Sequence, residues 1–129
     1  MDERLTKQED TPCFYAAIVL YFPVGTPQNE LIGFFRDSCS FKHYAQGNHL
    51  ELTVCEVENV FCWEVTEVLT QLFEACDLER VAAATRRYNG SVFIDISFVH
   101  KDRYPALIFE GSVMQTIHKL HASIGIDPY

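Results

Sequence analysis

The feature that most constrains this chain is an apolar run near its start, which extends from Cys13 to Phe22. Its side chains are apolar or aromatic throughout, and the run is far shorter than the ~20 residues that a membrane helix needs. Its β-branched and aromatic residues favour a strand. A strand that is apolar on both faces is typical of a sheet centre, covered on both faces or on one face plus a partner. We therefore expect this segment to form a central strand.

The next strong patterns predict a half-buried strand followed by the longest helix of the chain. Residues 49–57 alternate apolar and polar side chains, which is the period of a strand with one buried face. From about residue 60 to residue 80 the period becomes helical. The apolar stripe of this helix consists of Val65, Leu69, Leu72 and Cys76. Residues 81–86 either extend the helix or start a short new one after Asp77, and the spacing favours neither alternative.

A helix and a loop are expected between these two strands. Thr26 followed by Pro27 is typical of a helix start, because threonine can accept hydrogen bonds from free backbone N–H groups and proline has no N–H. We expect this helix to extend from Pro27 to about Asp37. Residues 40–48, which include a Gly-Asn pair, predict a loop.

The C-terminal third predicts a hairpin followed by a helix. Residues 91–99 alternate as a strand, and residues 106–109 are expected to pair with them as the second strand of the hairpin. Ser112 and Gln115 have the spacing of a capping box, in which each side chain satisfies a backbone N–H group. The helix that they begin is expected to close at Gly125.

Together these elements predict an α+β fold, with a mainly antiparallel sheet and helices packed on it. The expected order is β-α-β-α-β-β-α, with room for a short terminal strand. Residues 1–11 are charged and without periodicity, so we expect a flexible N-terminal tail there. Residues 12–129 are long enough to form a single domain whose core needs neither metal nor disulfide.

The charge and cysteine content exclude several classes of partner. A formal net charge of -8 disfavours non-specific electrostatic binding to a phosphate backbone, so we expect no nucleic acid partner. The polar N-terminus lacks the apolar run of an export signal, and we expect no membrane partner. Five cysteines, an odd number without a C-x-x-C pair, are typical of reduced thiols. These features predict a cytoplasmic protein.

The chain lacks the common signatures of enzymes and cofactor sites. A phosphate loop, a dinucleotide fingerprint, a nucleophile elbow and a zinc helix are all missing, so we expect no cofactor and lean against an enzyme. His118 and His121 could approach one metal, but no acid or cysteine stands at ligand spacing, and we predict no metal site. Cys39 and His43 could pair as thiolate and base, but an ordinary loop cysteine and histidine explain them better.

The acidic residues are concentrated in one segment of the chain. Residues 51–79 carry Asp and Glu but no Lys or Arg. A solvated helix face explains such a cluster, and so does a docking surface for a basic protein. Asp95, within the strand at residues 91–99, is expected on the solvent face. The candidate partner-binding residues are Glu56, Glu58, Glu64, Glu67 and Glu74.

Four stretches of the C-terminal part carry a resemblance to a family. They are Ser91-Val-Phe-Ile-Asp-Ile, Pro105-Ala-Leu-Ile-Phe-Glu-Gly, Ile117-His-Lys-Leu and Ile124-Gly-Ile-Asp-Pro-Tyr129. With the order of the elements, they resemble small bacterial proteins catalogued as domain of unknown function 4279. The likeness covers about residues 13–129 and implies a stand-alone cytoplasmic α+β domain without a known catalytic set. Proteins of this type are suspected to be immunity partners of toxins, which would agree with the acidic segment.

These observations support two hypotheses of different classes. The first is a non-enzymatic protein-binding module, such as an immunity-type inhibitor of a basic toxin or nuclease, that uses the acidic helix face. The alternative is a small-ligand-binding or enzymatic domain with a pocket between sheet and helices, where His43, Tyr44 and Arg103 would converge. An uncovered strand edge would also allow a homodimer.

Overall fold

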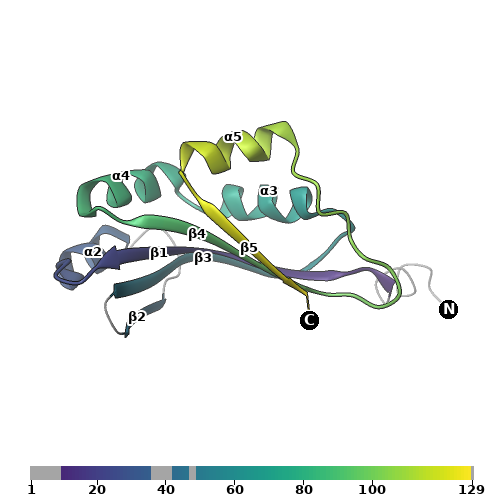
Figure 1. The fold of residues 1–129 in the computed structure, drawn as a ribbon, viewed down its shortest axis with the longest axis horizontal. Coiled ribbons are helices and arrows are strands. Elements are labelled where there is room, and N and C mark those ends of the chain that lie inside the picture. Colours follow the sequence, from purple (N-terminus) through teal and green to yellow (C-terminus); the bar gives the residue numbers. More distant parts are fainter. Residues whose placement is uncertain (1–9, 36–41, 47–48, 129) are drawn as a thin grey trace.

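The computed structural model describes residues 10–35, 42–46 and 49–128, and Figure 1 shows its arrangement of strands and helices. The strands are β1 (Cys13–Pro23), β2 (Lys42–Gln46), β3 (His49–Phe61), β4 (Ser91–Val99) and β5 (Ser123–Pro128). The helices are α2 (Gln28–Phe35), α3 (Val65–Ala75), α4 (Leu78–Tyr88) and α5 (Gly111–Lys119). Of the predicted tail, residues 1–9 lie outside the described residues. None of the described helices is long and apolar enough to cross a membrane.

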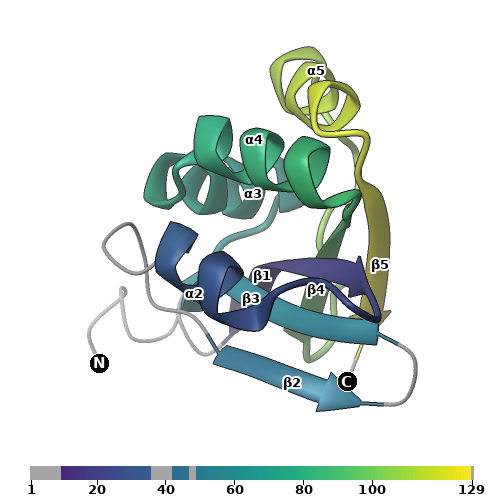
Figure 2. The same cartoon turned by 90° about the vertical axis from the view of Figure 1, so that its left-hand side faces the viewer.

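The strands form one mixed sheet in the order β2-β3-β1-β4-β5 within the described part of the chain. β1 lies at the centre and pairs antiparallel with both β3 and β4. β2 pairs antiparallel with β3, whereas β5 is parallel to β4. The helices lie on one side of the sheet, which curves around them in the end-on view (Figure 2). This arrangement confirms the α+β class and the mainly antiparallel sheet with helices packed on it.

The central position of β1 follows from its composition. Ile18 and Leu20 face the helices and are fully buried. On the other face, Ala17 and Val19 are also buried, at 1% and 7% exposure, although no described helix lies over them. β3 and β4 flank β1, and the larger side chains of these neighbouring strands surround Ala17 and Val19. The two residues are therefore buried without a second layer of helices.

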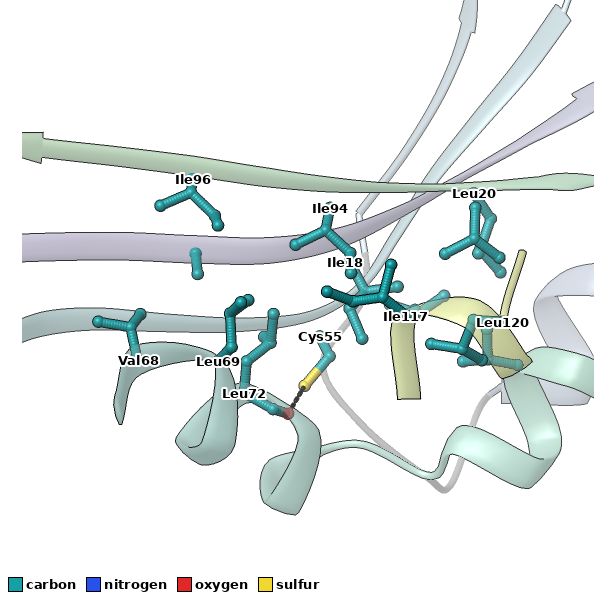
Figure 3. Packing of buried hydrophobic residues seen from close by; sticks show 14 of the residues in the cluster. Ile18, Leu20, Cys55, Val68, Leu69, Leu72, Ile94, Ile96, Ile117 and Leu120 are labelled. Carbon is teal, nitrogen blue, oxygen red and sulfur yellow. Dashed lines mark hydrogen bonds between the residues drawn. The ribbon is translucent and has the colours of Figure 1, made fainter. Parts of the chain in front are cut away.

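The core fills the space between the sheet and the helices. Figure 3 shows Ile18 and Ile94 directed from β1 and β4 toward Leu69 and Leu72 of α3. Ile117 of α5 joins the same cluster. A fully buried aliphatic side chain contributes about 1.5–3 kcal/mol relative to an exposed one, so this layer stabilises the fold strongly.

The predicted long helix is wrong at its start and is divided near its end. β3 continues to Phe61, so the helical segment begins at Val65 rather than near residue 60. It ends at Ala75, and the Asp77 carboxylate accepts a hydrogen bond from the Arg80 N–H at 3.1 Å to start α4. Of the two alternatives, the new helix after Asp77 is therefore correct, and it is as long as α3.

The C-terminal hairpin predicted at residues 106–109 is also wrong. Ala106 makes only an isolated parallel bridge with Glu64, and its N–H donates to the Trp63 carbonyl at 2.7 Å. The chain crosses to the α3 side of the molecule instead of turning back along β4. The expected second strand of a hairpin is thus a connection that ties the start of α3 to the segment before α5.

The last helix is shorter than predicted, because a strand follows it. Its N-cap is Glu110, without a side-chain cap, so the capping box of Ser112 and Gln115 is not used. The helix ends at Lys119, His121 adopts a positive φ of 52°, and the chain reverses into β5. Gly125 lies within this strand, where a Cβ atom would come 2.6 Å from the Phe93 ring. The terminal strand that the prediction allowed is therefore present.

The predictions between β1 and β3 need smaller corrections. Residues 42–46 of the predicted loop form the edge strand β2, and its other residues before β3 lie outside the described part. The first helix comprises Gln28–Phe35, and the predicted end at Asp37 is likewise not described. The Thr26 hydroxyl, just before this helix, donates a hydrogen bond to the Pro23 carbonyl at 2.7 Å.

Candidate functional site

No described helix covers the sheet face opposite the helices (Figures 1 and 2). Side chains alternate along each strand, and the register shows which residues of neighbouring strands share a face. We call this surface the open face. It consists of Cys13, Tyr15, Ala17, Val19 and Tyr21 of β1; Glu51, Thr53, Glu56 and Glu58 of β3; Ser91, Phe93, Asp95, Ser97 and Val99 of β4; and Ser123, Gly125 and Asp127 of β5.

Five carboxyl groups share the open face, and three different strands supply them. They are Glu51, Glu56, Glu58, Asp95 and Asp127. Among the residues that β1, β3, β4 and β5 place on this face, none is Lys or Arg, and Lys42 of the edge strand β2 pairs with Thr53. The open face is therefore strongly negative, and its charges lie close together because neighbouring strands are only about 4.8 Å apart.

Two tyrosines of the central strand donate hydrogen bonds to carboxylates of β3. The Tyr15 hydroxyl donates to Glu56 Oε2 at 3.0 Å, and the Tyr21 hydroxyl donates to Glu51 Oε1 at 3.1 Å. Phe93 of β4 meets Tyr21 edge to face, with ring centroids 6.4 Å apart. These contacts hold the carboxylates and the aromatic rings in one defined arrangement.

The electrostatics of the open face favour neutral tyrosines and disfavour the negative charge of Asp95. Burial raises the pKa of the Tyr15 hydroxyl, and its hydrogen bond to Glu56 raises that pKa further. The pKa of the Tyr21 hydroxyl is raised in the same way, by burial and by the hydrogen bond to Glu51. Burial raises the pKa of the Asp95 carboxyl, and the charges of Asp127 and Glu51 raise it further. A cation placed beside Asp95 would relieve this repulsion.

A shallow hollow lies at one end of the open face, where β1 begins and β4 ends. Its volume is about 250 Å³. Glu58 and Tyr15 border it, with Ser97 and Val99 from β4. A side chain of a partner could enter this hollow beside the Glu58 carboxylate.

The structure divides the five predicted partner-binding residues between two surfaces. Glu56 and Glu58 belong to β3 and lie on the open face. Glu64 and Glu67 lie at the start of α3, and Glu74 near its end, on the helix side of the sheet. The helix prediction from residue 60 had placed all five on one acidic segment, but β3 continues to Phe61 and separates the two groups.

The open face includes two acids, Asp95 and Asp127, that the sequence analysis did not predict as partner-binding residues. Asp95 lies away from the helices, as expected, but it is half-buried and its pKa is raised. Asp127 becomes its neighbour only because β5 pairs parallel with β4. The alternation of residues 91–99 could have indicated the position of Asp95, whereas no local pattern indicates Asp127.

The other predicted chemistry has less structural support. The rings of His118 and His121 lie 6.2 Å apart, and the described residues contain no group of three or more side chains that could hold a metal. Cys39 lies outside the described residues, and His43 is placed only by its backbone, opposite Leu52 in β3.

The pocket predicted between the sheet and the helices is filled by the core. Arg103 instead lines a hollow of about 770 Å³ beyond the end of β3, together with Trp63. Positions 43 and 44 pair with the opposite end of β3, roughly 30 Å along the strand. These residues therefore do not converge as the alternative hypothesis required.

No family model, curated protein or solved structure matches this chain. The resemblance to domain of unknown function 4279 therefore stays a sequence-based expectation.

Proposed function

We propose that this protein is a non-enzymatic binding domain that docks a basic protein on its open face. One observation carries the proposal: carboxyl groups from three strands, two of them held by tyrosines, gather on a sheet face that no described element covers. The proposal keeps Glu56 and Glu58 of the predicted set and adds Glu51, Asp95 and Asp127.

The size of the open face fits the central part of a protein interface. Four strands at about 4.8 Å spacing, over a length of about 20 Å, give a surface of roughly 300 Å². Each partner in a standard interface buries about 800 Å², so the open face would be the centre and the neighbouring loops the rim. The open face is the outer side of a curved sheet, and a surface of this extent suits a folded protein better than a small molecule, which prefers a concave site.

The aromatic residues of the open face favour tight binding. Tyrosine is enriched at interface hot spots, because it combines a large apolar surface with a hydroxyl group. Tyr15 and Tyr21 are already oriented by Glu56 and Glu51. Ordering a side chain on binding costs about 0.5–1.5 kcal/mol, so the two oriented tyrosines avoid much of that cost.

The charge of the open face favours a cationic partner, such as a nuclease or toxin whose own groove is basic. A negative surface accelerates association with such a partner and rejects acidic proteins. An immunity-type inhibitor would use the open face to cover the basic groove. The net charge of -8 extends the attraction beyond the contact surface.

Two triple variants with equal loss of charge test the proposal. The tagged protein is used to capture basic proteins from a lysate at low salt, and the recovered protein is purified for measurement of its Kd. The open-face variant carries Glu51→Gln, Glu56→Gln and Asp127→Asn. The control variant carries Glu74→Gln, Glu79→Gln and Glu110→Gln, all of which are exposed on the helix side.

We expect the open-face variant to weaken binding ~10-fold or more, and the control variant to change it less than about twofold. Glutamine and asparagine can still accept the tyrosine hydrogen bonds, so the fold should be preserved. Equal weakening by both variants would show that net charge alone attracts the partner, and it would remove the open face as the docking surface. Loss of binding at moderate salt is expected for wild-type protein.

A further inference from the structure

A second concave surface lies at the end of the sheet, and we call it the rim cleft. It has a volume of about 770 Å³. Its walls come from three parts of the chain: the segment before β1, the end of β3 with the start of α3, and the loop after β4. The lining residues are Asp10, Thr11, Phe61, Cys62, Trp63, Glu64, Glu67, Asp102 and Arg103.

Backbone hydrogen bonds join the walls of the rim cleft. The Cys62 N–H donates to the Pro12 carbonyl at 3.2 Å. Ala106 and the start of α3 exchange bonds, because the Ala106 N–H donates to the Trp63 carbonyl and the Val65 N–H donates to the Ala106 carbonyl at 3.0 Å. Burial raises the pKa of the Cys62 thiol to about 11, so this cysteine is a neutral part of the wall.

A cation of the protein itself already occupies the aromatic surface of the cleft. The guanidinium carbon of Arg103 lies 4.8 Å from the centroid of the Trp63 ring. Arg103 is exposed on the loop after β4 and makes no ion pair with any residue that the structure describes. The face of an indole ring attracts a cation by about 0.5–1 kcal/mol at an exposed site, which a competing cation could replace.

The cleft contains more negative charge than Arg103 neutralises. Four carboxyl groups line it, from Asp10, Glu64, Glu67 and Asp102, against the single guanidinium. Glu64 and Glu67 are exposed and form no ion pair with another described residue. They also stand at the start of α3, so part of their charge is balanced by the helix dipole. The remaining negative charge would favour a second cation.

We propose that the rim cleft binds an arginine side chain on a peptide segment, which takes the place of Arg103 on Trp63. Arginine fits better than lysine, because its flat guanidinium stacks on an aromatic ring and can also bond to a carboxylate in the fork geometry. The volume of the cleft exceeds that of a single side chain, so it can hold the neighbouring peptide groups too. This site is separate from the open face and does not depend on the function proposed for it.

Short peptides test the site on the intact protein. The probes are acetylated Gly-Arg-Gly amide, the same peptide with lysine, and the same peptide with citrulline, the neutral isostere of arginine. Trp63 is the single tryptophan of the chain, so its fluorescence reports on the cleft directly. We expect a saturable change with the arginine peptide, about fivefold weaker affinity with lysine, and no saturable change with citrulline. Equal affinity for all three peptides, or no saturation with arginine, would overturn the proposal.

Two substitutions in the same loop test whether Arg103 competes with the peptide. Arg103→Gln removes the internal cation from Trp63, and we expect it to strengthen arginine-peptide binding at least about threefold. Lys101→Gln removes the same charge two positions earlier, and we expect a change of less than about 1.5-fold because Lys101 does not line the cleft. Equal effects of the two substitutions would mean that charge alone acts, and the displacement of Arg103 would be refuted.

The open-face variant separates this site from the proposed docking function. It should bind the arginine peptide with unchanged affinity, since none of its substitutions lines the rim cleft. Trp63→Leu should abolish peptide binding. Because this variant has lost the fluorescent side chain, its peptide binding is measured by NMR. A far-ultraviolet spectrum and thermal unfolding show whether this variant is folded, and Arg103→Gln supplies the independent test on an exposed residue.

Discussion

The two faces of the sheet are built from the same strands but differ in what a side chain does there. Ile94 of β4 points to the helices and is fully buried, whereas its neighbour Asp95 lies on the open face among other acids. A difference of one residue along a strand therefore separates a core position from a position on the open face. The covered face supplies stability through packing, while the open face can hold charges that repel one another.

The largest expected effect comes from removing a buried side chain of the covered face. Ile94→Ala leaves a cavity where the sheet meets the helices, and we expect the free energy of unfolding to fall by about 2–5 kcal/mol. Val99→Ala on the same strand serves as the control, because Val99 is 55% exposed and should change stability by less than about 0.5 kcal/mol. Urea unfolding measures both. A loss below about 1 kcal/mol for Ile94→Ala would contradict the comparison.

One glycine packs against a phenylalanine ring on each face of the sheet, Gly90 on the covered face and Gly125 on the open face. A Cβ atom at Gly90 would lie 2.4 Å from the Phe22 ring, which is fully buried, and at Gly125 it would lie 2.6 Å from the ring of half-exposed Phe93. We expect Gly90→Ala to cost about 1–3 kcal/mol, because the buried ring cannot move away. Gly125→Ala should cost less than about 1 kcal/mol, because the exposed ring can rotate. Thermal unfolding compares them, and the reverse order of the two costs would refute this explanation.

A smaller effect is expected for the hydrogen bond between Tyr15 and Glu56. Tyr15→Phe keeps the ring and removes the hydroxyl that donates to Glu56, so we expect a loss of about 1 kcal/mol. Chemical denaturation at neutral pH measures this loss. The matched change Tyr104→Phe, on an exposed loop, should have no measurable effect. Identical stability of the two variants would show that Tyr15 and Glu56 are not coupled.

The smallest effect is expected for Asp95, and its sign depends on pH. Because the folded pKa of Asp95 is raised, the folded protein binds its proton more tightly than the unfolded chain does. The contribution of this group to stability is therefore gained as pH falls through the folded pKa, and it is complete below the unfolded value near 3.8. Asp95→Asn should stabilise the protein at neutral pH by less than about 1 kcal/mol and reduce this acid dependence.

Unfolding measured across the acid range compares wild type with Asp95→Asn. The control is Glu79→Gln on the exposed surface of α4, which should leave the pH profile unchanged. An Asp95→Asn variant that is less stable than wild type at neutral pH would show that the Asp95 charge is favourable in the folded protein. It would also remove the argument that a cation relieves repulsion at this position.

Local patterns predicted the elements well where one face of a segment was clearly apolar. The alternation of residues 91–99 and the helical stripe of Leu69 and Leu72 both correspond to observed elements. The local patterns failed at the boundaries of elements, because the same apolar residue fits the end of a strand and the start of a helix. Val60 lies near the end of β3, and Cys62 follows directly after that strand. Both side chains are buried, although their spacing also suits a helix.

The candidate site was predictable only in part. The acidic segment correctly indicated where negative charge is dense, and Glu56 and Glu58 belong to the open face. Tyr15 and Tyr21 were part of the central strand prediction, but their bonds to Glu56 and Glu51 depend on the register of β1 with β3. The register pairs residues that are far apart in the chain, so it cannot be predicted from composition or from local sequence patterns.

Local sequence patterns were sufficient to predict the class of fold and the central position of β1, because the period of apolar residues matches the geometry of each strand and helix. The acids that share a surface became clear from the pairing of distant segments in the folded chain. The parallel pairing of β5 places Asp127 beside Asp95, and the extension of β3 separates Glu56 from Glu67. Burial selects the apolar face of a segment locally, whereas the neighbours of a polar residue depend on how distant segments pair.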